Sequence, residues 1–248
     1  MNARDMHTLA AVTHDVSARI DAIEWPRIEA ELDAQGAALL PQLITPDECR
    51  ALAVLYDDEG AFRSRVVMAR HGFGQGEYRY FRYPLPPLIG ALRQAVYPHA
   101  VPLANRWHDA MGLPARFPLR HDEFVRRCHA HGQVRPTPLL LRYGPGDYNC
   151  LHQDVYGDEV FPLQLVLLLS QPGRDFAGGE FVMTEQRPRV QSRPMVLPLQ
   201  QGDGALIAVR HRPVRGARGF YRVNLRHGVS TVRSGRRFTA GIIFHDAA

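Results

Sequence analysis

The chain has 248 residues, 45% of them hydrophobic, which is enough to bury the core of one globular domain. Its longest apolar run, Leu163 to Leu169, is much shorter than the roughly 20 residues that a membrane-spanning helix needs. The three cysteines, Cys49, Cys128 and Cys150, are an odd number at unrelated spacings, which argues against a disulfide framework or a zinc site. We therefore expect a cytoplasmic protein with no membrane partner.

The charges are unevenly distributed along the chain. All 30 basic residues are arginines, and residues 1–60 hold 4 of them against 12 acidic residues. Between Arg187 and Arg237 the balance reverses, with 12 arginines against the single Asp203. Such a basic segment favours an anionic partner such as DNA or RNA, although clustered arginines can also form an ordinary solvated face.

Upstream of Pro136 the sequence pattern is mainly helical. A helix is predicted over Trp25 to Ala34 and a short strand over Ala37 to Leu40, with Gly36 between them. Thr45 is expected to cap a second helix. Two more helices are predicted within residues 88–111 and 120–131. Residues 1–136 are thus expected to form a mainly helical N-terminal elaboration.

From residue 137 to 248 the sequence pattern changes to short apolar runs separated by Gly, Pro and Asp. No segment there has a helical period over the length of a helix. This pattern predicts an antiparallel barrel or jelly roll, so the fold class is α+β, with the helices packed outside one integrated domain. The predicted strands are Leu139 to Tyr143, Leu163 to Leu169, Gly179 to Thr184, Met195 to Leu199, Ala205 to Val209, Tyr221 to Arg226 and Phe238 to Phe244.

A His-x-Asp pair, His152 and Asp154, follows a Gly-Pro-Gly turn that begins after Tyr143. In extended backbone, residues two apart point the same way, so both side chains can meet one ion. His227, 73 residues beyond Asp154, is predicted to supply a third ligand from a neighbouring strand. Two imidazoles and one carboxylate suit non-haem iron(II), and a zinc or cupin-type centre is the alternative.

Arg237 lies ten residues after His227, at the start of the last predicted strand. A guanidinium there could hold the distal carboxylate of 2-oxoglutarate through two parallel hydrogen bonds, which a zinc hydrolase or a cupin would not require. Arg233 and Arg236 are rivals for this role, and a solvated arginine at a strand start is the structural alternative.

Two further segments are candidates for contact with a nucleic acid. Tyr78 and Tyr80 alternate with arginines and could stack on bases, or they could belong to an amphipathic strand over the core. Arg215 and Arg218 belong to a basic hairpin that could follow a phosphate backbone. The preceding glycine-rich segment, Gly72 to Gly76, is predicted to be a mobile loop.

The stretch from Arg142 to the C-terminus resembles the 2-oxoglutarate/iron(II)-dependent dioxygenases, and within them a prokaryotic family predicted to demethylate damaged nucleic acid oxidatively. The resemblance implies a double-stranded β-helix with iron(II), 2-oxoglutarate and dioxygen at the site. It also implies that the hydroxyl of Tyr143 could contact the cosubstrate, as in prolyl-hydroxylase-like relatives, while an interior tyrosine with one satisfied hydrogen bond is the structural alternative. The segments that carry it are Tyr143-Gly-Pro-Gly-Asp-Tyr-Asn-Cys-Leu-His152-Gln-Asp154, Phe176-Ala-Gly-Gly-Glu180, Thr184-Glu-Gln-Arg-Pro-Arg189, Arg226-His227-Gly-Val-Ser and Ile242-Ile-Phe-His-Asp246.

The expected activity is therefore oxidative demethylation of alkylated nucleic-acid bases. Because the His-x-Asp motif also resembles that of prolyl hydroxylases, a hydroxylase of a protein side chain or of a small metabolite is the alternative. A third hypothesis is a binding module that has kept the fold without the chemistry.

Overall fold

The computed structural model describes residues 15–114 and 116–248. Its main helices are α2 (Trp25–Gln35), α3 (Pro46–Val54), α4 (Pro87–Ala110) and α5 (His121–Ala130). The strands are β1 (Ala37–Leu40), β2 (Phe62–Val67), β3 (Gly74–Gln75), β4 (Glu77–Phe81), β5 (Leu139–Tyr143), β6 (Tyr148–His152), β7 (Leu163–Leu168), β8 (Phe176–Gly178), β9 (Phe181–Gln186), β10 (Arg193–Leu197), β11 (Gly204–Ala208), β12 (His211–Gly216), β13 (Gly219–Val229), β14 (Val232–Gly235) and β15 (Arg237–Ile243).

The residues predicted to end α2 and to cap α3 have these roles in the structure. Gly36 ends α2 in the left-handed conformation, with φ at 76°, and its N–H donates to the carbonyl of Leu32. Thr45 caps α3, and its side chain and that of Glu48 satisfy each other's backbone N–H groups in a complete capping box. The chain is thereby turned from α2 directly into β1, which joins the main sheet.

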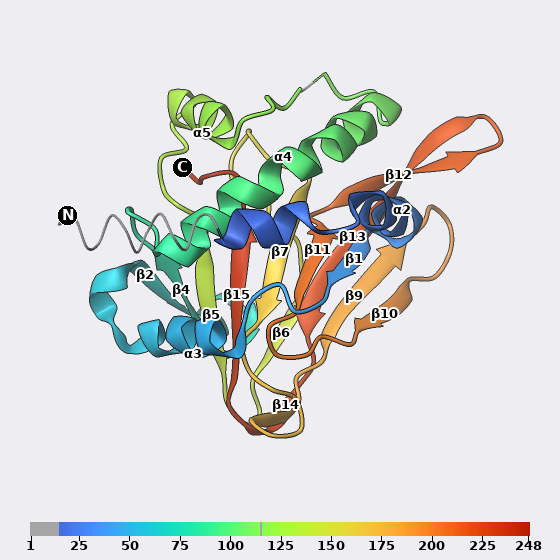
Figure 1. The fold of residues 1–248 in the computed structure, drawn as a ribbon. Helices are drawn as coiled ribbons and strands as arrows, with labels where there is room; N and C mark the ends of the chain where they lie inside the picture. The colour runs from blue at the N-terminus through green and yellow to red at the C-terminus, as the bar shows by residue number, and fades with distance from the viewer. Residues whose placement is uncertain (1–14, 115) are drawn as a thin grey trace.

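The strands form antiparallel sheets (Figure 1). A seven-stranded sheet has the order β1-β11-β7-β15-β5-β4-β2, and a six-stranded sheet has the order β10-β9-β13-β6-β3 with β12 paired to β13. A small sheet pairs β14 with β8. The predicted mixture of helices with antiparallel strands is confirmed, while the strands of the described ranges lie in separate sheets and not in one closed barrel.

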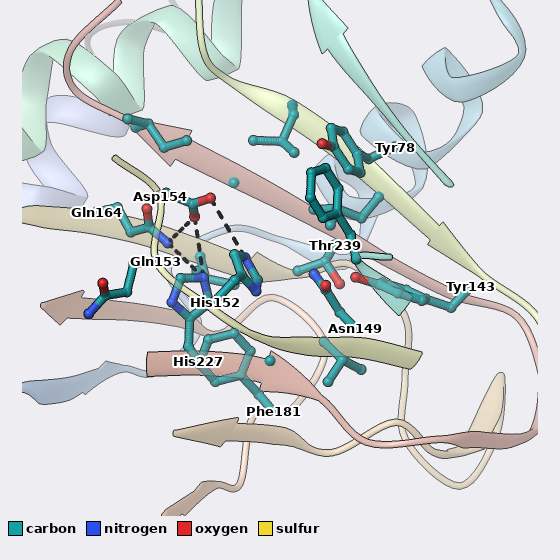
Figure 2. A pocket seen from close by; sticks show the side chains of 18 of the residues that line it. Tyr78, Tyr143, Asn149, His152, Gln153, Asp154, Gln164, Phe181, His227 and Thr239 are labelled. Carbon is teal, nitrogen blue, oxygen red and sulfur yellow. Dashed lines mark hydrogen bonds and ion pairs between the residues drawn. The ribbon is translucent and has the colours of Figure 1, made fainter. Parts of the chain in front are cut away.

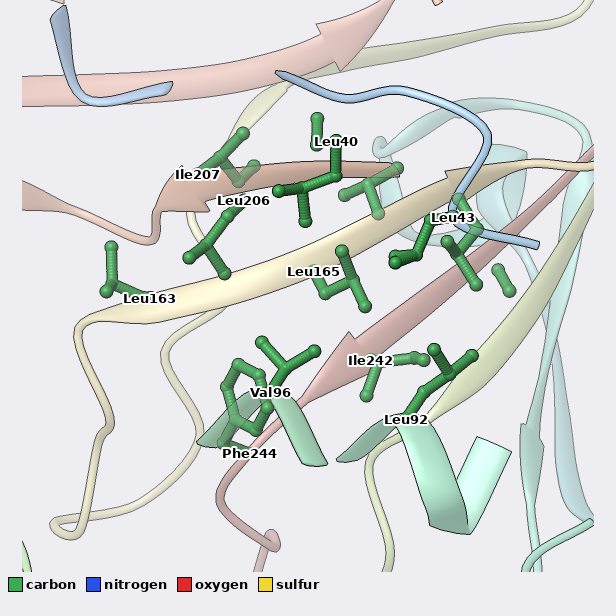
Figure 3. Close-up of a cluster of buried hydrophobic side chains, with 14 of the residues drawn as sticks. Leu40, Leu43, Leu92, Val96, Leu163, Leu165, Leu206, Ile207, Ile242 and Phe244 are labelled. Atoms are coloured by element: carbon green, nitrogen blue, oxygen red, sulfur yellow. The ribbon is translucent and has the colours of Figure 1, made fainter. Parts of the chain in front are cut away.

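The seven-stranded sheet is buried on both faces at its centre. Alternate residues of β7 and β15 point toward α4, where Leu165 and Ile242 pack near Leu92 and Val96 (Figure 3). The intervening residues point to the other face, and Gln164 of β7 is among those that line a cavity there. Because β7 is covered on both sides, it is a continuous apolar run with few polar residues.

The prediction of a mobile loop at residues 72–76 is wrong for its centre. Gly74 and Gln75 form β3 and pair with Asn149 and Tyr148 of β6. Gly74 has φ at 131°, and a Cβ there would lie 2.4 Å from the carbonyl oxygen of Tyr148. Only glycine permits this close approach, so the segment is fixed against the edge of the six-stranded sheet.

Several short strands were not predicted from the sequence, namely β2, β3, β6, β8, β12 and β14. Most of them are edge or end elements whose few residues carry no clear period-2 pattern. No helix in the described ranges is both long enough and apolar enough to cross a membrane.

Candidate active site

The structure brings His152, Asp154 and His227 together (Figure 2). His152 ends β6 and lies directly opposite His227 of β13, with the two ring centroids 4.3 Å apart. The Asp154 Oδ2 atom lies 3.3 Å from the Nε2 atom of His227, and its Oδ1 atom lies 3.6 Å from the Nε2 atom of His152. Three ligands at about 2.1 Å from one ion on perpendicular axes would be about 3 Å apart, so this spacing fits a metal ion.

Hydrogen bonding and charge favour the protonation states that a divalent cation needs. The Nδ1 atom of His152 lies 2.8 Å from the carbonyl oxygen of Cys150, so Nδ1–H donates there and Nε2 keeps its lone pair. Burial, with the neighbouring His227, lowers the pKa of His152. Burial raises the pKa of Asp154, but His152, His227 and Gln164 outweigh it and hold that pKa well below its usual range. His152 is thus favoured as a neutral imidazole and Asp154 as a carboxylate.

These three residues line a cavity of about 200 Å³ between the two larger sheets. Its apolar wall comes from the inner face of the seven-stranded sheet, at Leu139 and Leu141 of β5, Val166 of β7 and Ile243 of β15. Phe181 of β9 closes the opposite side and stacks on the His227 ring, with the centroids 5.8 Å apart.

Arg237 lies in the same cavity and is only 1% exposed. Its Nη1 atom donates to the hydroxyl of Thr239, its Nε atom has no partner, and no carboxylate of the described residues pairs with it. Burial lowers its pKa to about 10. An unpaired buried cation is costly, so the site suits an anionic ligand such as a carboxylate.

Tyr143 lies directly across from Arg237 in the register of β5 and β15, and the guanidinium carbon is 5.5 Å from the centre of its ring. The phenol is fully buried, and burial raises its pKa to about 12. The hydroxyls of Tyr143 and Thr239 therefore lie close to Arg237, and a carboxylate bound there could accept hydrogen bonds from them.

The candidate substrate residues do not lie together. Tyr78 lines the cavity, but Tyr80 is only 9% exposed and donates to the hydroxyl of Tyr156, so its geometry fits the alternative of a strand over the core. Arg215 and Arg218 are exposed on the hairpin of β12 and β13, which projects from the sheets in Figure 1. Arg218 is nine residues from His227, about 30 Å along an extended strand.

Several residues of the cavity were missed in the sequence. Thr239 could have been found, because it lies two residues after Arg237 on the same strand and therefore faces the same way. Phe73 lines the cavity while 47% exposed, at the mouth. Gln164 and Tyr156 both hydrogen-bond to Asp154; Tyr156 carries no motif that would have marked it, and the one signal for Gln164 is that it is an isolated amide in the apolar run of β7.

A model of the family described as "Oxygenase, catalysing oxidative methylation of damaged DNA" matches residues 76–247, a range that contains the whole cluster and Arg237. The chain belongs to this family. It is also 50% identical over 168 residues to the uncharacterized protein MT2286 of Mycobacterium tuberculosis, an alignment that covers 68% of this oxygenase and 72% of that protein.

Solved structures share the fold of this oxygenase. A Pseudomonas putida prolyl-4-hydroxylase matches with a TM-score of 0.52 at 13% identity, over 88% of this chain and 96% of that one. An oxidoreductase of the 2OG-Fe(II) oxygenase family from Burkholderia pseudomallei matches with a TM-score of 0.52 at 18% identity, over 92% and 94%. The predicted oxygenase is confirmed by the family model, and His152, Asp154 and His227 are a group that could hold a metal ion.

Proposed function

We propose that this oxygenase demethylates alkylated nucleic-acid bases, with iron(II) held by His152, Asp154 and His227 and 2-oxoglutarate held by Arg237. The observation that carries the proposal is a two-histidine, one-carboxylate cluster in the same cavity as a buried arginine that has no acidic partner within residues 15–114 and 116–248. The family description supplies the substrate class, damaged DNA. In this proposal the two larger sheets are the two faces of a double-stranded β-helix. The described part of residues 1–136 forms one domain with residues 137–248, since β1 pairs with β11 and β4 with β5.

When bound, iron(II) and 2-oxoglutarate supply the oxidation: dioxygen is reduced, 2-oxoglutarate becomes succinate and carbon dioxide, and one oxygen atom enters an N-methyl C–H bond. The hydroxymethyl group then leaves as formaldehyde and the base recovers its N–H. The chain's own task is to hold the reactants. Arg237, with Thr239 and Tyr143, would fix the distal carboxylate, and the apolar wall at Leu141 and Val166 would keep water from the reacting atoms.

Two aromatic side chains at the cavity, Phe73 and Tyr78, favour the proposal of a planar substrate. Phe73 is at the mouth of the cavity with its ring stacked near His71, at 5.3 Å between centroids, and Tyr78 lines the cavity from β4. Both rings could contact an unstacked base presented to the iron, because aromatic faces stack on any nucleobase. The carbonyl oxygen of Phe73 accepts from the N–H of Cys150 at 2.9 Å, next to the pairing of β3 with β6, so Phe73 is anchored to the strand that ends at His152.

The direct test is formaldehyde release from single-stranded DNA that carries one methylated base, with iron(II) and 2-oxoglutarate present. We expect formaldehyde and succinate in equal amounts, with His152→Ala as the inactive control. If every methylated base fails while peptides or small metabolites are hydroxylated, the alternative hydroxylase activity is correct and the nucleic-acid proposal is wrong. If iron(II)-dependent decarboxylation of 2-oxoglutarate is also absent, the chain is a binding module.

A second prediction concerns the basic hairpin. Neutralising Arg215 and Arg218 together should weaken binding to single-stranded DNA and reduce the slope of log affinity against log salt by about 1.4, roughly 0.7 for each lost phosphate contact. Binding is measured by fluorescence anisotropy over a salt series. Decarboxylation in the absence of DNA should not change, because the hairpin tip lies far from the cavity.

The matched control for this prediction replaces Arg50 of α3 and Arg126 of α5, which are exposed arginines on helices outside the hairpin. Their removal should leave the salt slope unchanged. An equal loss in both double variants would indicate nonspecific attraction by the basic chain, and no change in either would remove the hairpin from the binding surface.

A further inference from the structure

Both oxygen atoms of the Asp154 carboxylate accept a hydrogen bond from a side chain that has no assigned role. The hydroxyl of Tyr156 donates to Oδ1 at 2.8 Å, and the Nε2 amide of Gln164 donates to Oδ2 at 2.9 Å (Figure 2 shows the Gln164 contact). Asp154 lies after the last residue of β6, in a segment without strand pairing, so the sheet ladder does not fix its direction. The hydrogen bonds from Tyr156 and Gln164 fix the direction of the carboxylate instead.

Gln164 is held rigidly. It lies on β7 between β11 and β15, opposite Ile207 on one side and Ile243 on the other, and is 3% exposed. Its Nε2 atom is also 3.2 Å from the Nε2 atom of His227, so one amide contacts two of the three proposed iron ligands. A polar side chain inside an otherwise apolar strand is costly, and here all its hydrogen bonds are directed at this cluster.

Tyr156 is oriented by a second hydroxyl. Tyr80 donates to the Tyr156 oxygen at 3.1 Å, which leaves the single proton of Tyr156 for Asp154. The backbone around Tyr156 is anchored as well, because the buried Gln133 donates to the Tyr156 carbonyl at 3.0 Å and accepts from the N–H of Glu159 at 2.7 Å. The order Tyr80, Tyr156, Asp154 is therefore a chain of donors that ends on the carboxylate.

We infer that Tyr156 and Gln164 are positioning residues that hold the Asp154 carboxylate in the orientation for binding iron(II), and that Tyr80 acts through Tyr156. The inference rests on the proposed role of Asp154 as a metal ligand. It assigns Tyr80 a role different from the base stacking that its sequence pattern allowed. Hydrogen bonds to a ligating group usually change metal affinity 10- to 100-fold when removed, so the effect is measurable without turnover.

The test measures the binding of Co(II) alone to the full chain by titration calorimetry, in the absence of 2-oxoglutarate. Tyr156→Phe keeps the ring and removes the donor, and Gln164→Leu keeps the volume and removes the amide. Each should weaken Co(II) binding by roughly 10-fold or more, the scale of an outer hydrogen bond to a ligand, and the double variant should weaken it further. The thermal unfolding of each variant without metal shows whether the fold is retained.

Matched controls separate positioning from general damage. Tyr221→Phe on β13 and Gln201→Leu before β11 make the same chemical changes outside the cavity and should keep the affinity of the parent chain. His152→Ala, which removes a proposed ligand, should lose Co(II) binding. If His152→Ala loses the metal but Tyr156→Phe and Gln164→Leu keep it, the positioning inference is overturned and the proposed centre stands. If His152→Ala binds Co(II) as tightly as the parent, the proposed centre itself is wrong.

Discussion

Replacing His152 by alanine should abolish 2-oxoglutarate turnover while leaving the protein folded. The imidazole is one of the three candidate ligands, and losing a ligand should cost more than the roughly 10- to 100-fold in affinity or activity that the loss of an outer hydrogen bond costs. The side chain is 34% exposed and makes one hydrogen bond, to Cys150, so the free energy of unfolding should fall by no more than about 1 kcal/mol. Succinate formation and thermal unfolding are the two measurements.

His211→Ala is the matched control for that experiment. His211 is a half-buried histidine of β12, close in sequence to the basic hairpin, but it belongs neither to the cluster nor to the cavity. Its replacement should leave decarboxylation near the level of the parent chain. Persistent turnover in His152→Ala, or an equal loss in His211→Ala, would contradict the assignment of His152.

The grouping of His152, Asp154 and His227 could be predicted because the His-x-Asp spacing constrains where two of the side chains point. In extended backbone a His-x-Asp pair points both side chains one way, and a later strand that carries His227 needs only to lie beside the first. In the structure β6 ends at His152, so the direction of Asp154 depends also on its hydrogen-bond partners. In the structure His152 and His227 are direct cross-strand neighbours, a pairing that the sequence could not specify. Register between strands 75 residues apart depends on the whole sheet and not on local propensity.

The residues that surround the cluster were harder to find because their role comes from their partners. Gln164 is a single polar residue within the apolar run of β7, and such a residue has no evident partner until the sheet is assembled. Tyr156 lies in an irregular segment, where no periodicity assigns a face. An isolated amide in a strand that is buried on both faces is a signal that could have been used.

For the candidate substrate residues, the sequence indicated the secondary structure but not the surroundings of the side chains. The alternation around Tyr78 and Tyr80 correctly indicates a strand, but whether that strand presents its rings to solvent depends on what packs over it. Tyr80 is covered by the guanidinium of Arg63 at 4.5 Å and by Tyr156, so it lies inside the protein. Arg215 and Arg218 are exposed as predicted, yet exposure alone does not place them near the chemistry.

Arg237→Ala should raise the 2-oxoglutarate concentration needed for half-maximal turnover by roughly 100-fold, the equivalent of about 3 kcal/mol from lost charge-assisted hydrogen bonds. The maximal rate should change less, because the distal carboxylate is remote from the reacting carbon. The guanidinium has no acidic partner among the described residues, so its removal leaves no other buried charge unpaired, and the protein should stay folded. Succinate formation over a 2-oxoglutarate series measures both quantities.

Arg236→Ala and Arg233→Ala are the matched controls, because both arginines are exposed neighbours that the sequence alone left as rivals. Neither replacement should shift the 2-oxoglutarate dependence. Arg237→Lys should give an intermediate value, since lysine keeps the charge but cannot form two parallel hydrogen bonds with one carboxylate. A normal cosubstrate dependence in Arg237→Ala, with a shift in either control, would transfer the anchoring role to that neighbour and leave the buried guanidinium of Arg237 without a ligand.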